Sequence, residues 1–563
     1  MKHHLCRFPA TAIAAMVLAG CTPPDQPEPA AATDPDALVA RAGAPLFEDM
    51  GNHHHAITTS DPGAQRYFDQ GLIFDFAFNH AESARSFRAA QRLDPECAMC
   101  YWGEALALGP NINVTSNGKV VMADDDRLAA FAAIRKAVAL KDNATGRERD
   151  YIDALAARYN GDLSTPREPL DAAYADAMRE LHRKYPDDDD AAVLFAEALM
   201  NRMPWNYWLD PENPKPSTVE VLEVLETVLA RSPDHPMAIH LYIHAVEASS
   251  SPERAEAAAD RLGELVPAAG HLVHMPAHIY WRVGRYHDAS MANVRAAAVD
   301  EAYIAQCNAQ GFYPALYYPH NIHFLWAASS MEGRSKLAIE SARKVAANVR
   351  LDMIEEFPAV EFFHTIPLLA LLQFGQWDDV LAEPQPPADL EFSNGIWHYA
   401  RTVAFARQHD LEAARAERER LAPLLEAEGV FFLDTLDYPA SSLLHIADAL
   451  AAGEVAMAAG DLDRAVDSFA AAVSMQDALP YTEPPFWYYP TRHSLGKALL
   501  AKDDAARAEA VYRKDLEYYP HNGWAMYGLI QSLEAQGKDA SGVQAMFEHA
   551  WSQADVTLTA STF

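Results

Sequence analysis

A pattern that recurs about every 34 residues constrains the fold of this chain more than any other feature. In residues 64–97, Gly71 occupies the eighth position, Phe87 the 24th and Pro95 the 32nd. The same phase returns, as a glycine with an alanine five residues later, at 284–289, 333–338 and 460–465. Units of this kind stack side by side, so the 563 residues do not need one oversized hydrophobic core.

This spacing resembles the tetratricopeptide repeat, in which two antiparallel helices cross at small residues and aromatic side chains fill the flanks. The resemblance covers most of the chain after residue 64 and implies an all-α solenoid of roughly 10–12 helix pairs. No alternating strand pattern of any length is present in the sequence. We expect an N-terminal and middle solenoid over 46–380, a C-terminal solenoid over 381–563, and insertions at 110–126, 203–217 and 304–317.

The chain begins with the pattern of a bacterial export signal. Basic residues precede a short apolar stretch, residues 9–17, which is too short to span a bilayer as a stable helix. The stretch continues into Leu18-Ala19-Gly20-Cys21, which resembles the lipobox of bacterial lipoproteins. This resemblance implies removal of residues 1–20 as a signal peptide and lipidation of Cys21. The alternative is an ordinary signal peptide that happens to contain a cysteine.

Lipidation would attach the chain to the cell envelope. Thr22 follows the cysteine where Asp would favour retention, and in enterobacteria this implies the outer membrane, facing the periplasm. Residues 21–45 are rich in Pro and Ala and are expected to form a disordered tether after the lipidated cysteine. Cleavage would also remove Lys2 and Arg7, which changes the formal net charge from −34 to −36. So acidic a body argues against nucleic-acid binding and would suit basic segments of an envelope protein or peptide.

Cys97 and Cys100 form a C-x-x-C pair. In an oxidising periplasm the pair is expected to close as a disulfide; a redox-active pair, metal ligands or reduced core thiols are the alternatives. No His follows Cys100, as c-type haem attachment would require, and no second Cys pair completes a zinc site. The missing His leads us to expect no haem. The sequence also contains no Walker A motif or other glycine-rich phosphate loop, so we expect no nucleotide.

Histidines gather on one face of three successive repeats. In the tetratricopeptide family the first helix of each pair lines a concave groove through its positions 2, 5, 9 and 12. The resemblance assigns these positions to His240, His244 and Glu247, to His271, His274 and His278, and to His320 and His323. The fifth position is therefore His in three repeats in a row, and helix axes roughly 8–10 Å apart would let the rings converge.

A convergent cluster of His and Glu suits a divalent transition metal: Zn, Cu or Fe. Two other interpretations remain open: the groove binds a non-metal ligand, or its histidines only hydrogen-bond to neighbours and water. Pro276 adds a constraint, because it starts or kinks a helix and could turn the preceding histidines away. We expect metal ligands at His240, His244, Glu247, His274, His278 and His323, and further groove contacts at His271, His320, Glu197 and His493.

Three other runs have simpler interpretations. Residues 53–55 are three histidines before the first repeat, and residues 187–190 are four aspartates. We expect both runs to be solvated; the alternative for the histidines is that they cap the groove or bind metal weakly. The aspartate run lacks the Gly and the terminal Glu of a calcium loop. Residues 485–490, PFWYYP, stand beside His493 and are expected to fill a joint between repeats, although they could also stack on a ligand.

These observations lead to three hypotheses. The first is a lipid-anchored, periplasm-facing solenoid whose His-lined groove binds a ligand, above all a metal ion. The second is an interaction scaffold that holds a peptide or helix of an envelope partner. The third is a metalloenzyme with Glu247 or Glu197 as general base. No motif indicates a substrate, a catalytic residue or a reaction, so a binding role is favoured over an enzymatic one.

Overall fold

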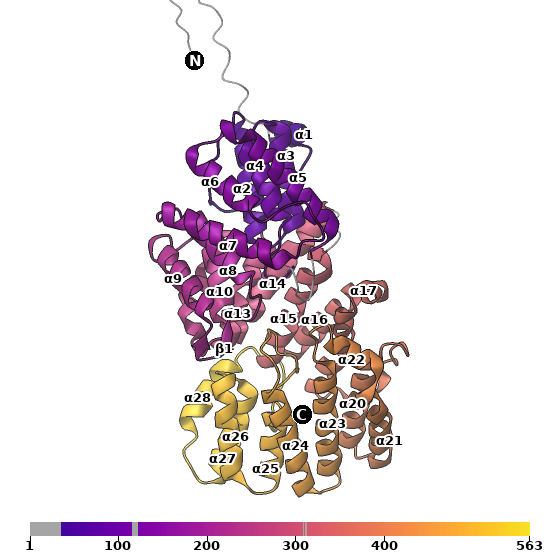
Figure 1. Cartoon of the computed structure of the whole chain (residues 1–563). Helices are drawn as coiled ribbons and strands as arrows, with labels where there is room; N and C mark the ends of the chain where they lie inside the picture. The colour runs from indigo at the N-terminus through magenta and orange to yellow at the C-terminus, as the bar shows by residue number, and fades with distance from the viewer. Residues whose placement is uncertain (1–34, 115–121, 308, 310–311) are drawn as a thin grey trace, which may run out of the picture.

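The computed structural model describes residues 35–114, 122–307, 309 and 312–563. The predicted lipidation site, Cys21, the signal peptide and the first part of the tether lie outside the described residues. Stacked helices make up most of the described chain and strands almost none of it, so the all-α prediction is confirmed (Figure 1). In the part of the chain that the structure describes, no helix is long and apolar enough to cross a membrane.

The helices follow one another as antiparallel neighbours along the chain (Figure 1). The N-terminal part contains α1 (Pro35–Ala42), α2 (Pro62–Phe76), α3 (His80–Leu93), α4 (Ala98–Ala107), α5 (Asp124–Leu140), α6 (Gly146–Ala156), α7 (Arg167–Lys184), α8 (Asp189–Met200) and α9 (Pro216–Arg231). The middle part contains α10 (Pro236–Val246), α11 (Glu256–Leu265), α12 (Gly270–His274), α13 (Pro276–Arg282), α14 (Tyr286–Cys307), α15 (Tyr318–Met331), α16 (Ser335–Asn348), α17 (Leu351–Glu356), α18 (Ile366–Gln373) and α19 (Trp377–Ala382). The C-terminal part contains α20 (Glu391–Arg407), α21 (Leu411–Leu421), α22 (Glu428–Asp434), α23 (Ala440–Ala458), α24 (Leu462–Asp477), α25 (Arg492–Ala501), α26 (Ala505–Tyr518), α27 (Gly523–Ala535) and α28 (Ser541–Ala550).

Shorter elements occupy the connections. Four segments form 3₁₀ helices: Lys141–Asn143, Pro252–Ala255, Pro358–Thr365 and Ala422–Glu426. Tyr313–Tyr317 is a single turn of π-helix within the predicted insertion 304–317. Insertion 203–217 carries the antiparallel strands β1 (Trp208–Asp210) and β2 (Asn213–Pro214), and the Trp208 indole donates to the Ala245 carbonyl at 2.8 Å. This small hairpin is therefore fastened to the end of α10.

The small residues of the repeat pattern act as predicted. A side chain on Gly71 would meet the Phe87 ring at 2.9 Å, so only glycine lets α2 and α3 approach this closely. Glycines at the predicted turns have left-handed φ angles, 79° at Gly284 and 72° at Gly333, which residues with a side chain rarely adopt. The alanine five residues later is fully buried in both hairpins. The 34-residue phase therefore places helix ends and crossing points correctly.

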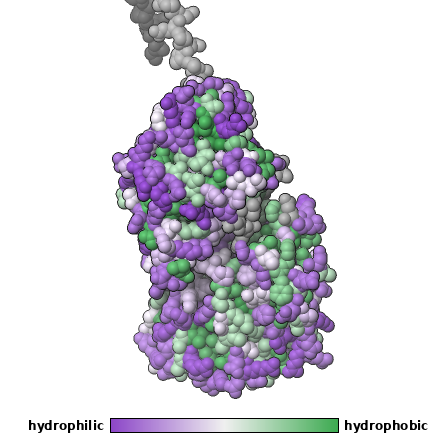
Figure 2. Space-filling model, viewed as in Figure 1, coloured by the Kyte–Doolittle hydropathy of each residue, from purple (hydrophilic) through white to green (hydrophobic). Residues whose placement is uncertain are grey.

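The last repeats return to the middle of the chain. The Trp524 indole in α27 donates to the Ser330 carbonyl in α15 at 3.0 Å, and the Asp555 amide donates to the Gly333 carbonyl at 3.1 Å. This closure leaves a cleft of about 1300 Å³ between the hairpin of insertion 203–217 and the C-terminal part. Hydrophilic residues cover most of the outer face, with scattered apolar ones between them (Figure 2).

Candidate metal centre

Six histidines from four helices meet in the interior of the middle repeats. α10 contributes His240 and His244, α12 and α13 contribute His271, His274 and His278, and α15 contributes His320. They divide into two sets, which we call the first triad (His240, His244, His271) and the second triad (His274, His278, His320). Within each triad, one ligand-capable atom per residue lies within 4.8 Å of the other two.

The first triad is centred on His240. Its Nε2 atom lies 3.1 Å from His244 Nε2 and 3.2 Å from His271 Nε2. Nitrogens bound to one tetrahedral metal at about 2.0–2.1 Å are separated by about 3.3 Å. His240 Nε2 therefore already lies at about the spacing of a metal-bound pair from each of the other two rings.

The second triad repeats this geometry on the next hairpins. His274 Nε2 lies 2.8 Å from His278 Nε2 and 3.2 Å from His320 Nε2. The triads are adjacent, since the ring centroids of His244 and His278 are 5.6 Å apart and those of His271 and His274 are 5.8 Å apart. The structure thus presents two three-imidazole sites side by side.

The opposite ring nitrogens determine where the protons sit. In the first triad, His240 Nδ1 lies 2.7 Å from the Phe76 carbonyl oxygen, and His244 Nδ1 lies 2.9 Å from Glu247 Oε1. Both oxygens are acceptors, so both Nδ1 atoms must donate, and each neutral ring then carries a lone pair on Nε2. Two lone pairs consequently face each other across 3.1 Å between His240 and His244.

The second triad has the same outer pattern. His274 Nδ1 donates to Asn293 Oδ1 at 2.6 Å, because the Asn293 amide nitrogen is already bonded to the Ala289 carbonyl. His278 Nδ1 donates to Glu247 Oε2 at 2.6 Å. The Nε2 atoms of His274 and His278 face each other at 2.8 Å, and a cation between the rings holds them together: a second proton on His278 or a metal ion bound to both rings.

Glu247 joins the two triads from outside. Its two carboxylate oxygens accept from His244 of one triad and His278 of the other, and the side chain is buried. His244, Glu247 and His278 also come within 4.8 Å of one another, but the carboxylate lies on the Nδ1 side, away from the converging Nε2 atoms. Glu247 was predicted as a metal ligand, and its place fits a partner that orients two ligands instead.

Burial and charge shape the protonation of these groups. Burial, together with neighbouring imidazoles, holds the pKa values of His240, His271, His274 and His320 well below the ordinary value. Burial alone would also lower the pKa of His278, but the carboxylates of Glu247 and Glu483 outweigh it and raise that pKa. Burial also lowers the pKa of His244 despite the Glu247 carboxylate, so five of the six rings are neutral, the form that binds metals.

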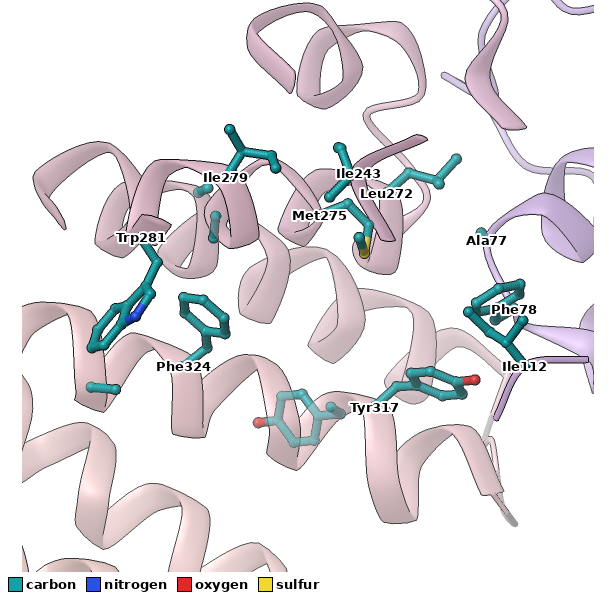
Figure 3. Packing of buried hydrophobic residues seen from close by; sticks show 14 of the residues in the cluster. Ala77, Phe78, Ile112, Ile243, Leu272, Met275, Ile279, Trp281, Tyr317 and Phe324 are labelled. Atoms are coloured by element: carbon teal, nitrogen blue, oxygen red, sulfur yellow. The ribbon is translucent and has the colours of Figure 1, made fainter. Parts of the chain in front are cut away.

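Buried aromatic residues pack against the rings of both triads, and Figure 3 shows three of them, Phe78, Tyr317 and Phe324. Phe78, from the loop after α2, lies with its ring centroid 4.5 Å from that of His240. Tyr317 stands 4.9 Å from His271, and Phe324 stands 5.3 Å from His274 and 5.2 Å from His278. Apolar neighbours of this kind lower the local dielectric constant and strengthen the electrostatic interactions of the ligands.

Backbone features hold the middle hairpin in place. The helix is interrupted at Met275, and Pro276 begins α13, yet His274 and His278 still point at each other across the interruption. At the start of α12 a side chain on Gly270 would meet Asp300 at 1.9 Å. The Asp300 carboxylate accepts from Tyr313, whose hydroxyl in turn accepts from the His271 amide. Because His274 and His278 face each other across the break, Pro276 does not turn the histidines away.

The predicted site residues are thus distributed unequally. Predicted ligands His240, His244, His274 and His278 come together, joined by His271 and His320, which were expected only as groove contacts. His323 does not join them: its ring stacks on Trp326 at 5.3 Å and packs against Phe362 and Phe363. The sequence phase could have found His320, because His271 and His320 share position 2, whereas attention to position 5 selected His323.

Glu197 and His493 lie in other buried clusters. Burial and the nearby charge of Asp75 raise the pKa of Glu197 to about 7, and its carboxylate contacts Asn201. His493 contacts Asp515 and Asn522 between the C-terminal helices. Sequence reasoning missed Glu483, Asn293 and Asp300, since no short-range spacing connects them to the histidines. Cys97 and Cys100 form a disulfide at the start of α4, away from the triads.

A separate cluster involves the two runs that were expected to be solvated. The Asp190 carboxylate accepts hydrogen bonds from His55 Nδ1 at 2.6 Å and His235 Nε2 at 3.1 Å. His53 Nε2 also lies 3.1 Å from the same carboxylate. We call these four residues the Asp190 cluster. The expectation of solvation was wrong for Asp190 and His55, which are buried because the histidine run folds over α8, and it holds for the exposed His54. The residue types of this cluster could also hold a metal.

Comparison with known proteins gives similarity of fold only. No family model and no curated protein matches the sequence. Human IFIT1, solved as a dimer with m7Gppp-AAAA, is 12% identical with a TM-score of 0.31, covering 77% of this chain and 87% of that one. Yeast Tom70 is 12% identical with a TM-score of 0.29, covering 88% and 92%. The TPR domain of P58(IPK) is 10% identical with a TM-score of 0.21, covering 84% and 98%.

Proposed function

We propose that this chain is an envelope-anchored helical-repeat protein that holds two transition-metal ions side by side, one in each triad. The observation that carries the proposal is the pairing of fixed outer hydrogen bonds with converging Nε2 lone pairs. In the first triad the lowered pKa values leave no ready proton to separate the lone pairs of His240 and His244. A metal ion satisfies both rings at once.

The ligand chemistry restricts the kind of metal. Six imidazoles with no thiolate and no directly converging carboxylate suit Cu, Zn or Fe better than Mg or Ca. Three protein ligands leave each ion an open coordination position, as catalytic sites have and structural zinc sites do not. The shared carboxylate of Glu247 would orient one ligand of each ion, as hydrogen-bonded carboxylates do at many metal-bound histidines.

Elemental analysis of untagged protein tests the proposal directly. Protein with Cys21→Ser, which removes the predicted lipid attachment, should contain about two ions per chain when loaded with Cu, Zn or Fe and freed of excess. His240→Ala/His271→Ala should lower the content to about one ion, and so should His274→Ala/His320→Ala. A wild-type chain without any bound ion, or the same content in all three proteins, would refute it.

The lipid anchor is tested separately. Cells that produce the wild-type chain should incorporate labelled palmitate into it and hold it in the membrane fraction, facing the periplasm. Cys21→Ser should lose the label and leave the membrane. Labelling that survives Cys21→Ser would place the acylation elsewhere and contradict this part of the proposal.

A second candidate function is a scaffold for a basic segment of an envelope partner. It is favoured by the cleft of about 1300 Å³, whose lining includes the acidic residues Asp210, Asp434, Asp437 and Asp477. Two arginines also line the cleft, but Arg492 donates to Asp477 and Arg282 donates to backbone carbonyls. Such a surface complements Lys and Arg side chains. Cross-linking in cells should capture a partner that Asp434→Asn/Asp437→Asn releases; a partner that stays bound would count against the cleft.

A further inference from the structure

A second cavity opens directly onto the triads. It encloses about 350 Å³, and one wall carries His244 and His271 of the first triad and His278 and His320 of the second. We call this cavity the chamber. His240 and His274 do not line it, so they lie behind the other four rings. Whatever occupies the chamber therefore contacts both metal sites from the side on which ligands can be added.

The remaining walls are aromatic and aliphatic. Phe362 and Phe363 from the middle repeats face Tyr438, Phe486 and Trp487 from the C-terminal part. The rings of Phe362 and Tyr438 are stacked 5.1 Å apart at 14°, so the two walls meet at this pair. The aromatic run 485–490 thus lines a cavity in addition to filling a joint between repeats. Aromatic walls of this kind favour apolar, aromatic molecules.

The lining of the chamber favours an uncharged ligand. Among the described residues that line it, none is Lys or Arg, whereas Glu247, Asp437 and Glu483 are acidic. Most of the other lining side chains are aromatic or aliphatic, so a charged molecule would lose its hydration on entering. A cation would also approach the metal ions of the proposed function, so a neutral molecule fits the chamber best.

The chamber adjoins the open cleft. It shares Trp205, Asn113, Glu483 and Phe486 with the lining of the cleft, so these residues border both spaces. Trp205 is 47% exposed at this junction, and its ring centroid lies 4.9 Å from that of His244. Trp205 therefore stands between the open cleft and the imidazole wall, where a small molecule would enter.

From these features we infer that the chamber binds a neutral aromatic small molecule with its polar end against the two triads. The inference rests on the proposed function for the identity of the polar end, because a hydroxyl or amine would face the open coordination positions there. The volume of about 350 Å³ lies within the range of small-molecule sites. Neutral phenols and aryl amines are the class of ligand that this combination of walls, charge and size selects.

Fluorescence binding measures the chamber itself. The probe is N-phenyl-1-naphthylamine, added to the full chain with Cys21→Ser as purified. Its emission should rise on binding, and 4-hydroxybiphenyl should displace it, whereas the size-matched anion biphenyl-4-carboxylate and the cation phenyltrimethylammonium should not. Equal displacement by either ion, or no binding of the probe, would overturn the inference.

Two variants place the probe in the chamber. Leu436→Trp fills the cavity from a half-buried position and should weaken binding by about tenfold or more. Val219→Trp adds the same ring at a site on α9 that is 42% exposed, and should leave binding unchanged. Should Leu436→Trp fail to fold, Phe486→Leu removes an aromatic face at similar volume and should weaken binding several-fold. Wild-type affinity in the folded chamber variant would overturn the assignment.

Copper separates this inference from the proposed function. Cu²⁺ added to the probe complex should quench its emission, because a paramagnetic ion in either triad would lie against the chamber wall. His240→Ala/His274→Ala removes one ligand of each triad without changing the chamber lining, so this variant should still bind the probe but lose the quenching. Quenching that persists in this variant would overturn the placement beside the triads. Probe binding without any bound metal in the wild type would refute the proposed function while leaving the aromatic chamber.

Discussion

Two histidine clusters lie on opposite sides of Phe76 and differ in what their rings face. The Phe76 ring contacts His53 and His235 of the Asp190 cluster, and its carbonyl oxygen accepts from His240 of the first triad. In the Asp190 cluster, the ring nitrogens point at a carboxylate. In the triads, the carboxylate and carbonyl oxygens lie behind the rings, and the inner nitrogens point at one another.

This difference determines which cluster needs a cation. His235 Nδ1 accepts from the Ala238 amide, so its Nε2 carries the proton and donates to Asp190. His55 and His235 are therefore satisfied by hydrogen bonds to the Asp190 carboxylate. In the triads, His240, His244 and His274 each use the Nδ1 proton in a hydrogen bond to an outer oxygen, so no proton lies on the inner Nε2 atom. The number of histidines does not distinguish a metal site from a hydrogen-bonded cluster; the partner of the far nitrogen does.

The largest expected effect comes from removing one inner histidine of each triad. His244→Ala/His278→Ala leaves two imidazoles per site, so the metal content of purified protein should fall from about two ions per chain to none. The matched variant His53→Ala/His235→Ala removes two histidines of the Asp190 cluster and should keep both ions. Metal loss in this control instead would reverse our assignment of the two clusters.

Asp190→Asn should have the next largest effect, on stability alone. It removes the charge that His55 and His235 face in a buried site, so the free energy of unfolding should fall by about 3–5 kcal/mol. Denaturant unfolding measures this change, and elemental analysis should show unchanged metal content. A variant as stable as the wild type would mean that the Asp190 cluster contributes nothing as an ion pair.

Glu247→Gln should act on the triads more mildly than loss of a ligand. The amide keeps the shape of the side chain but orients His244 and His278 less strongly, so metal affinity should fall by about 10–100-fold. Competition with a chelator measures the affinity at both sites. Because Glu247 lies behind both triads, an effect on only one ion would contradict its shared role.

The smallest expected effect is a pH dependence confined to the Asp190 cluster. Burial would raise the pKa of Asp190, but His235, His53 and His55 outweigh it and lower that pKa, so its stabilisation is present above about pH 4 and lost in acid. Burial would lower the pKa of His55, but Asp190 raises it, so this contribution is present below about pH 6.5 and lost as pH rises.

Unfolding of wild type and Asp190→Asn across the pH range tests this sign. The difference between their unfolding free energies should be greatest between about pH 4 and 6.5 and should shrink on both sides. A difference that keeps growing above pH 7 would mean that His55 is neutral in the folded chain. Metal-loaded protein is suitable for both variants, since the Asp190 cluster does not involve the triads.

The sequence predicts the fold better than the site. Gly71, Gly284 and Gly333 mark crossings and turns through local backbone constraints, so the repeat phase carries over to the structure directly. It also brings most of the triad histidines onto one face. The partition into two triads depends on the break at Met275 and on side-chain directions between repeats, which the phase does not encode.

Long-range partners were beyond any pattern in the sequence. His278 meets Glu483 at 3.3 Å only because the C-terminal repeats fold back onto the middle ones. Similarly, Asp190 looks like part of a solvated acidic turn until residues 53–55 are placed over it. His323 holds the same repeat position as His240 and His274, but its ring packs against Trp326, Phe362 and Phe363. The repeat phase gives the face of the helix and not the direction of each side chain.

The way each triad draws on neighbouring hairpins has a consequence for how the array unfolds. The first triad joins α10 to α12, and the second joins α12 and α13 to α15. In a stack where each unit mainly contacts its neighbours, stability is a sum of unit terms and interface terms. Metal ions would add to two consecutive interfaces, so the loaded array should melt from its ends toward α10–α15. Removing the metal would make the centre an ordinary stretch of the stack, open to unfolding from within.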